Sequence, residues 1–309
     1  MDASTELPDG VALAPVGAEN PYRLKRCRQG TMLYNVNDRY IGRSLDLYGE
    51  WAEAELELLG LFIKPGDSVV DVGANLGTHT VFFAHKAGAR GAVFAFEPQR
   101  VVFQLLCANL ALNGLTNVHA YHAAVSRLKG TTSVPDVAYD DAGNYGGVAL
   151  RHDRDGVDAS GDGRASASAP APAPAPPTGE RVPVMMLDEL ALGRCRLLKI
   201  DVEGMELEVL EGARGLVEAT RPLIYVENND VTRSPALITW LLERQYQLFW
   251  HVSPFFNPRN FAANPDNVFA NLADLNMIAV GPELAPALGR FPRVTGPADN
   301  WQALQERLR

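Results

Sequence analysis

Short apolar segments alternate with stretches of helical periodicity along most of this chain. Segments rich in β-branched and aromatic residues predict strands, whereas apolar residues spaced three or four positions apart predict helices. Seven strands are predicted, at 68–72, 92–97, 118–121, 195–201, 223–227, 246–252 and 276–280. Helices are predicted after the first strand and at 100–112, 202–212, 234–242 and 301–309. The alternation predicts an α/β, Rossmann-like fold, with a mainly parallel seven-stranded sheet, helices on both faces and one antiparallel strand near the C-terminus.

The first strand leads through a glycine turn into a helix, an arrangement that opens many nucleotide-binding sheets. Gly73 and Gly77 stand in this turn, with Ala74 and Asn75 between them. A dinucleotide site favours glycines at positions i, i+2 and i+5, but here they stand at i and i+4. Asp71 would also repel a pyrophosphate by several kcal/mol, at about 5 Å and an effective dielectric near 20. The turn therefore favours a cationic ligand such as S-adenosylmethionine, which binds through its ammonium at Asp71, over NAD.

A second acidic residue supports a nucleoside ligand. Glu97 ends the strand at 92–97, about 20 residues after the glycine turn, where a carboxylate can accept both ribose hydroxyls. The alternative for Glu97 is a solvated acid at a strand end. Pro98 follows directly, and the segment 122–126, which includes Ala124, is expected to run beside the adenine.

Four segments of the sequence resemble the FkbM family of S-adenosylmethionine-dependent methyltransferases. They are DVGANLGTHTVFFA from Asp71, FEP at 96–98, LLKIDVEGMEL at 197–207 and GEWAEAE at 49–55. The resemblance extends from about Tyr40 to Val280 and is most specific in LLKIDVEGMEL. It implies a class I methyltransferase fold and O-methylation of a hydroxyl on a sugar, glycan or secondary metabolite. It also implies that the helix start around Trp51 folds over the cofactor, although a core position for Trp51 is an equal alternative.

Acidic residues close several predicted strands, at the sheet edge where ligands bind in such folds. Asp201 and Glu227 end strands, Glu203 follows Asp201, and His251 lies near the end of the strand at 246–252. The proton of an acceptor hydroxyl must leave as the methyl group arrives, and a base or a metal ion could remove it. We expect a metal-free base among these four residues, with Asp201 also facing the cofactor, because no ligand spacing demands an ion. For Glu203 the alternative role is a favourable charge at a helix N-terminus.

The long segment at 253–272 contains phenylalanines among many Asn and Pro residues. Long loops beside a ligand-binding edge are often functional. We therefore expect this loop to form the acceptor side of the pocket, with packing over the sheet as the alternative role. The phenylalanines in it are Phe255, Phe256, Phe261 and Phe269.

Composition sets the expected domain organisation. Residues 1–60 are expected to form a tail and a cofactor-covering helical segment, 61–284 the methyltransferase domain, and 285–309 a C-terminal tail with a short helix. Residues 141–179 are rich in Ala, Pro, Ser, Gly and Asp, so we expect a disordered insertion between strands at 130–134 and 181–185.

Charge and cysteine content limit the binding partners and the cell compartment that we expect. A net charge of -9 over 309 residues argues against nucleic acid and anionic membrane surfaces, although basic residues cluster at 23–28. Three cysteines without metal-ligand spacing indicate a reducing compartment, and the absence of an apolar stretch of about 18 residues predicts a soluble, cytoplasmic protein. The expected partner is a small-molecule or glycan hydroxyl acceptor, with a homodimer left open. An NAD-linked oxidoreductase and a non-catalytic methyltransferase-like binding module are the alternative functions.

Overall fold

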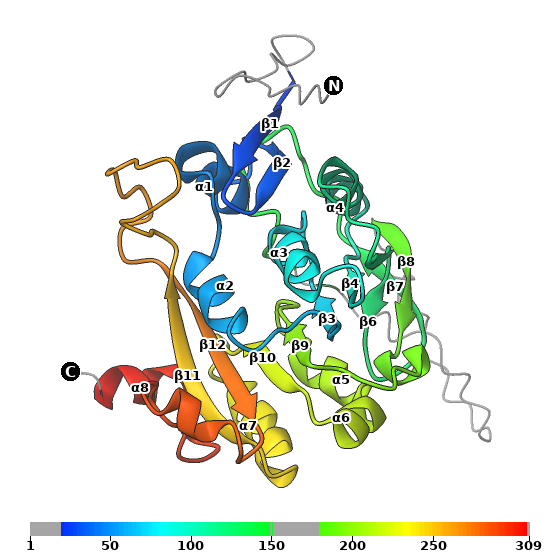
Figure 1. The fold of residues 1–309 in the computed structure, drawn as a ribbon, viewed down its shortest axis with the longest axis vertical. Coiled ribbons are helices and arrows are strands. Elements are labelled where there is room, and N and C mark those ends of the chain that lie inside the picture. The colour runs from blue at the N-terminus through cyan, green and yellow to red at the C-terminus, as the bar shows by residue number, and fades with distance from the viewer. Residues whose placement is uncertain (1–19, 149, 151–178, 308–309) are drawn as a thin grey trace, which may run out of the picture.

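A seven-stranded sheet forms the centre of the protein (Figure 1). The computed structural model describes residues 20–148, 150 and 179–307. The strands of the sheet are β3 (Ser68–Val72), β4 (Ala92–Phe96), β5 (Val118–Tyr121), β9 (Leu197–Ile200), β10 (Leu223–Glu227), β11 (Gln247–Pro254) and β12 (Ala273–Val280). They lie in the order β11-β12-β10-β9-β3-β4-β5, and only β12 runs antiparallel to its neighbours. The expected fold class, including the single antiparallel strand, is confirmed.

Helices cover both faces of this sheet because its buried strands carry apolar side chains on both faces. The helices are α1 (Ile41–Tyr48), α2 (Glu53–Leu59), α3 (Thr78–Ala87), α4 (Arg100–Leu112), α5 (Glu206–Glu211), α6 (Arg214–Thr220), α7 (Ser234–Glu243) and α8 (Trp301–Arg307), with 3-10 turns η1 (Leu187–Leu190) and η2 (Ala285–Leu288). Val70 and Val72 of β3 share a buried cluster with residues of α5, α6 and α7. Val69, which precedes Val70 and faces the other side of the strand, packs instead with residues of α2 and α3.

Two smaller sheets flank the centre. β1 (Tyr22–Cys27) and β2 (Gly30–Asn35) form an antiparallel hairpin that packs on α4, at the opposite end of the molecule from α6 and α7 (Figure 1). β6 (Ala124–Val125), β7 (Gly130–Val134) and β8 (Glu180–Met185) form the other sheet, in the order β6-β8-β7. The strands expected on either side of the insertion therefore pair with each other.

The first residues of the expected insertion are packed. Tyr145 is 4% exposed, and its hydroxyl oxygen lies 2.9 Å from the carbonyl oxygen of Tyr139 and 2.7 Å from that of Asp141, within reach of a hydrogen bond to either. Gln99 Nε2 donates to the carbonyl of Tyr145 at 2.7 Å. The structure of residues 141–148 thus differs from the expected disorder, because one buried aromatic side chain anchors them. The rest of the insertion, except residues 150 and 179, and residues 1–19 of the predicted tail lie outside the described residues.

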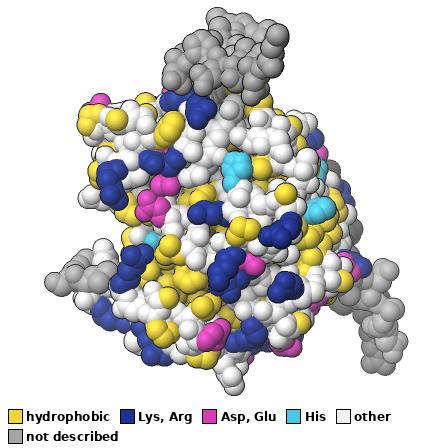
Figure 2. Space-filling model, viewed as in Figure 1, with side chains coloured by type: hydrophobic (Ala, Val, Ile, Leu, Met, Phe, Trp, Pro, Cys, Tyr) yellow, Lys and Arg dark blue, Asp and Glu magenta, His cyan; other side chains and the backbone are white. Residues whose placement is uncertain are grey.

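On the face in Figure 2, Lys and Arg side chains are interspersed with apolar and acidic ones. The helices in the described ranges lack the length and apolar character that a membrane span requires. Cys27, Cys107 and Cys195 are all free thiols.

Candidate functional site

A cavity of about 310 Å³ lies at the carboxyl ends of the parallel strands. It has the size of a small-ligand site. The glycine turn after β3, the ends of β4, β9 and β10, and the segment 144–148 line one part of it, and the aromatic side chains of Tyr40, Trp51 and Phe255 line another. The cavity therefore occupies the edge at which ligands bind in open α/β sheets.

The glycine turn forms one wall of the cavity. Gly73, Ala74 and Asn75, three of the predicted cofactor-binding residues, line it. Gly73 has φ +79°, and a Cβ on it would lie 1.8 Å from the carbonyl oxygen of Asp201, so only glycine fits here. Gly77 does not line the cavity, because it faces α4, where an added Cβ would lie 2.7 Å from Leu106.

Glu97 lies beside this turn and is 3% exposed. Its Oε2 accepts a hydrogen bond from the Asn75 amide at 3.0 Å, and its Oε1 accepts one from the Gln99 amide at 2.8 Å. Burial raises the pKa of Glu97 to about 7, although these two amides favour the charged form. Pro98 and Ala124, also predicted to bind the cofactor, line the cavity as well.

The donor set fits the nucleoside part of S-adenosylmethionine. The carboxylate of Glu97 has lone pairs left for two ribose hydroxyls after its amide bonds. Small apolar side chains, among them Ala123 and Ala124, offer a flat wall for a purine ring. An acidic lining at the other end suits a ligand that carries a sulfonium and an ammonium.

Asp71 is placed outside the cavity. It is fully buried, its Oδ2 accepts a hydrogen bond from Thr80 Oγ1 at 2.6 Å, and its Oδ1 lies 3.7 Å from Lys199 Nζ. Strand alternation explains this, because Asp71 projects to the face covered by α3 instead of beyond the strand end. The structure therefore does not bring Asp71 to a position where it could hold the cofactor's ammonium.

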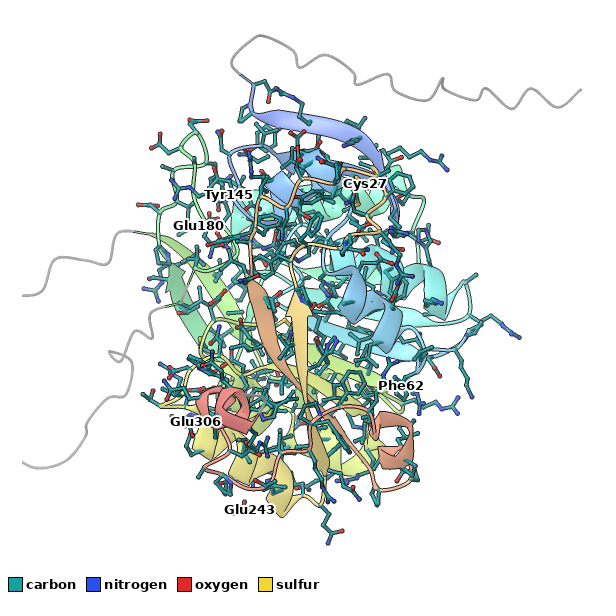
Figure 3. All side chains as sticks on the ribbon, turned by 90° about the vertical axis from the view of Figure 1, so that its left-hand side faces the viewer. Cys27, Phe62, Tyr145, Glu180, Glu243 and Glu306 are labelled. Carbon is teal, nitrogen blue, oxygen red and sulfur yellow. The ribbon has the colours of Figure 1, made fainter. Side chains whose placement is uncertain are left out.

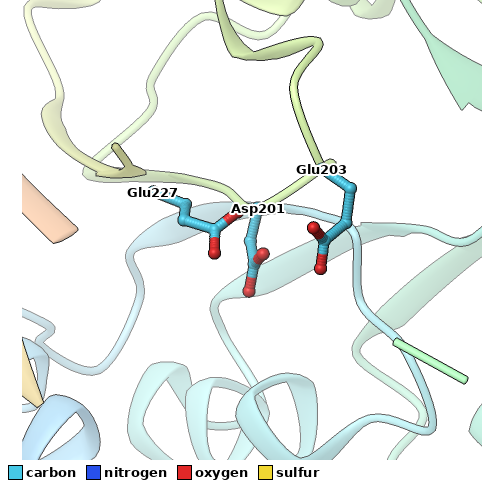
Figure 4. A group of neighbouring side chains, drawn as sticks. All are labelled: Asp201, Glu203 and Glu227. Atoms are coloured by element: carbon cyan, nitrogen blue, oxygen red, sulfur yellow. The ribbon is translucent and has the colours of Figure 1, made fainter. Parts of the chain in front are cut away.

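Three predicted catalytic residues do come together. Asp201, Glu203 and Glu227 each place a carboxylate oxygen within 4.8 Å of the other two, and Figure 4 shows the three side chains converging. Glu203 reaches the group because helix α5 starts only at Glu206, later than predicted. The intervening turn holds Glu203 at φ +54° and Gly204 at φ +98°. A left-handed φ at a residue other than glycine is strained and often marks a functional site.

Burial and mutual repulsion raise the pKa values of the glutamates in this group. Two ionised carboxylates about 5 Å apart repel by roughly 3 kcal/mol at an effective dielectric near 20. Burial, followed by the charge of Asp201, raises the pKa of Glu203 to about 7 and that of Glu227 to about 11. Glu227 is therefore protonated at neutral pH unless a cation joins the group.

Lys199 is the buried cation next to these acids. It is 2% exposed, and its Nζ lies 3.2 Å from Asp201 Oδ2. Burial favours the neutral amine, but Asp201 and Asp71 outweigh it and raise the pKa of Lys199. One ammonium thus links the strand carboxylate of Asp71 to the cavity carboxylate of Asp201.

The structure separates His251 from the three carboxylates. The strand β11 continues to Pro254, so His251 lies inside the strand and not at its end, and β12 stands between it and Glu227. Its Nδ1 shares a hydrogen bond with the Tyr225 hydroxyl at 2.8 Å, and it does not line the cavity. Burial lowers the pKa of His251. The prediction of His251 as a catalytic residue is therefore not supported by its position.

Other lining residues were not predicted. Glu55 Oε2 lies 3.0 Å from His79 Nε2, and Asn276 Nδ2 donates to Glu55 Oε1 at 3.0 Å, so this buried group joins α2, α3 and β12. Asp274 of β12 lines the acidic end. The detectable signal for such residues is a charged side chain within an apolar segment, as in EAELELL of α2.

Trp51 is part of an aromatic wall of the cavity. Its ring lies 4.9 Å from that of Phe255, and it is 9% exposed where it lines the cavity. Phe269 packs behind them, with its ring 5.6 Å from that of Phe255. In contrast, Phe261 is exposed and Phe256 packs on Tyr48 outside the cavity lining.

The chain is similar to known methyltransferases. The family model described as Methyltransferase FkbM domain matches residues 71–248. The chain is 31% identical over 161 residues to methyltransferase sdnD of Sordaria araneosa, covering 47% of this chain and 59% of that protein. It is 32% identical over 162 residues to 31-O-demethyl-FK506 methyltransferase FkbM of Streptomyces tacrolimicus, covering 50% of this chain and 62% of that one. The chain thus spans less than two thirds of either relative.

Solved structures show weaker similarity. A methyltransferase FkbM from Methylobacillus flagellatus KT is 15% identical, with 73% of this chain and 50% of that chain covered and a TM-score of 0.42. A SAM-dependent methyltransferase from Aquifex aeolicus is 13% identical, with 79% and 94% covered and a TM-score of 0.37.

Proposed function

Because this chain belongs to the FkbM methyltransferase family, we propose that it methylates a hydroxyl oxygen of a sugar, glycan or secondary metabolite with S-adenosylmethionine. The observation that carries the proposal is one cavity lined by Glu97 beside the glycine turn and by the three carboxylates of Asp201, Glu203 and Glu227. The family match favours this function over an NAD-linked oxidoreductase.

The proposed cofactor end is the glycine turn. Glu97 would accept the ribose hydroxyls, and the amides of Asn75 and Gln99 hold its carboxylate in place. The cofactor supplies an electrophilic methyl group on a sulfonium sulfur. The acidic end of the cavity would attract this positive charge and orient it toward the acceptor.

Asp201 is the proposed base. Its Oδ2 lies 3.2 Å from Lys199 Nζ, whereas Glu227 is protonated at neutral pH. The bound cofactor would supply the methyl group to the acceptor oxygen and leave as the neutral thioether. Asp201 would take the hydroxyl proton.

The acceptor would lie between Asp201 and the aromatic wall. Trp51, Tyr40 and Phe255 offer apolar faces that suit a sugar ring or a polyketide. The side chain of Asn229 also lines this end and can bond hydroxyl groups.

Glu97→Ala is expected to weaken binding of S-adenosylhomocysteine by about 1.5 to 3 kcal/mol, roughly 10- to 150-fold, since hydrogen bonds to a charged group have this strength. Titration calorimetry measures the dissociation constant. An unchanged value in a folded variant would remove Glu97 from the cofactor site.

The pH dependence of this affinity gives a separate prediction for Glu97. Its pKa of about 7 means that the carboxylate form, the better acceptor for ribose hydroxyls, gains population as pH rises from 6 to 8. Affinity for S-adenosylhomocysteine should therefore rise over this range in the wild type. Glu97→Gln cannot ionise and should lack that part of the rise. Equal pH profiles in both proteins would contradict the assignment.

Phe255→Ala should raise the Michaelis constant of the acceptor while the affinity for S-adenosylhomocysteine stays unchanged, because Phe255 lines the aromatic wall and not the glycine turn. Phe261→Ala is a matched control, because its ring is exposed. Loss of both acceptor and cofactor binding in Phe255→Ala would favour a packing role.

Incubation with labelled cofactor and a panel of hydroxylated glycans, glycolipids and polyketides tests the function itself. Label that is transferred to an acceptor and stays bound in mild base would support O-methylation of an alcohol, because a methyl ether resists the hydrolysis that removes a methyl ester. Cofactor binding without transfer to any acceptor would favour a non-catalytic binding module.

A further inference from the structure

Glu227 carries a buried oxygen that has no hydrogen-bond partner. The residue is 8% exposed, and its Oε1 accepts a hydrogen bond from Asn229 Nδ2 at 2.7 Å, whereas its Oε2 is buried without a partner. The carboxylate points toward Asp201 and Glu203 (Figure 4). A buried, unsatisfied acceptor of this kind is costly and calls for a ligand.

Few positive charges lie near the three carboxylates in the described part of the chain. Among the described residues, Lys and Arg nitrogens come within ion-pair distance of Asp201 but not of Glu203 or Glu227. The nearby Arg233 is directed elsewhere, since it pairs with Asp230 at 3.3 Å and donates to the carbonyl of Gly204. The single ammonium of Lys199 is shared between Asp71 and Asp201.

We propose that Asp201, Glu203 and Glu227 bind a hard divalent cation such as Mg²⁺ or Mn²⁺. Three carboxylate oxygens within 4.8 Å of one another are close enough to share one ion, and oxygen ligands with room for water or substrate suit these metals. The strained turn at Glu203 supports the site, because its left-handed φ brings the third carboxylate to the group. This site differs from the metal-free one expected from the sequence.

The ion would lie at the acceptor end of the cavity. There it would lower the pKa of a hydroxyl that coordinates it and assist the removal of the proton. This consequence rests on the proposed function, but binding of the ion does not. The two can therefore be tested apart.

Electron paramagnetic resonance with Mn²⁺ on the full chain, without any cofactor, measures the binding directly. The wild type should bind one Mn²⁺ per chain, and Glu227→Gln should weaken that binding at least about 10-fold. Glu243→Gln is the control, since Glu243 lies on α7 with a side chain 67% exposed, far from the Tyr145 end of the molecule (Figure 3). Should Glu227→Gln fail to fold, Glu203→Gln in the preceding turn replaces it.

Three results would overturn the metal site. The wild type could bind no Mn²⁺, Glu227→Gln could bind Mn²⁺ as tightly as the control Glu243→Gln, or S-adenosylhomocysteine could displace the bound Mn²⁺. The last result would assign the carboxylates to the cofactor's ammonium. A protein that binds S-adenosylhomocysteine and transfers methyl groups but takes up no Mn²⁺ would retain the proposed function and lose the metal site. A protein that binds Mn²⁺ but not S-adenosylhomocysteine would retain the metal site and lose the proposed function.

Discussion

Lys199→Met is expected to lower the free energy of unfolding by about 3 to 5 kcal/mol, the usual cost of leaving one charge of a buried pair without its partner. Methionine fills a similar volume, so the loss comes from electrostatics and not from a cavity. Asp71 is fully buried, and Lys199 is the cation that lies within 3.7 Å of its Oδ1. Without that ammonium, the hydroxyl of Thr80 is its remaining side-chain partner.

Denaturant unfolding measures this loss, and a melting temperature about 6 to 20 °C lower should accompany it for a chain of this size. Lys86→Met is the matched control, because Lys86 is an exposed residue of α3 and its loss should change stability by roughly 0.5 kcal/mol or less. Adding Asp71→Asn to Lys199→Met should recover part of the stability. If Lys199→Met is as stable as Lys86→Met, the buried pair does not stabilise the fold.

The sheet could be predicted because buried parallel strands are apolar along their whole length. The predicted segment at 223–227 coincides with β10, and the one at 92–97 exceeds β4 by only Glu97. An acid that ends or directly follows such a segment must lie at the strand end, and Glu97 and Glu227 do lie there, where they line the cavity.

The apolar character of the whole strand also made the direction of the Asp71 side chain unpredictable. A strand that is apolar on both faces has no alternation from which the face of a single polar residue can be read. The prediction that His251 lies at a strand end was wrong for another reason. The length of β11 depends on its pairing with β12, in which Ser253 and Pro254 lie opposite Asp274 and Ala273. Pairing of this kind is a tertiary contact.

The turn at Glu203 was also beyond prediction. Helical periodicity favoured a helix from residue 202, but the chain adopts two left-handed residues there before α5 begins. Glycine at 204 is a signal for such a turn, whereas a left-handed glutamate is not. Likewise, the composition of residues 141–179 pointed to disorder and outweighed the single aromatic residue Tyr145 that packs at its start.

Asp201→Asn is expected to lower kcat by about 100-fold or more, the usual contribution of a general base, while the affinity for S-adenosylhomocysteine changes little. The amide is nearly isosteric with the carboxylate but accepts no proton at neutral pH. Residual activity should rise with pH, because hydroxide can then remove the acceptor proton. A variant that is merely misfolded would not recover in this way.

Glu227→Gln separates two versions of the site. If Asp201 acts alone, Glu227 is protonated at neutral pH and its amide should retain most of the turnover. If the carboxylates hold a divalent ion, Glu227 is one of its ligands, so both variants should lose turnover to a similar degree, and chelation should inactivate the wild type. Single-turnover measurements at saturating cofactor decide between these outcomes. Wild-type rates in both variants would exclude base and ion together and leave proximity and orientation as the main source of catalysis.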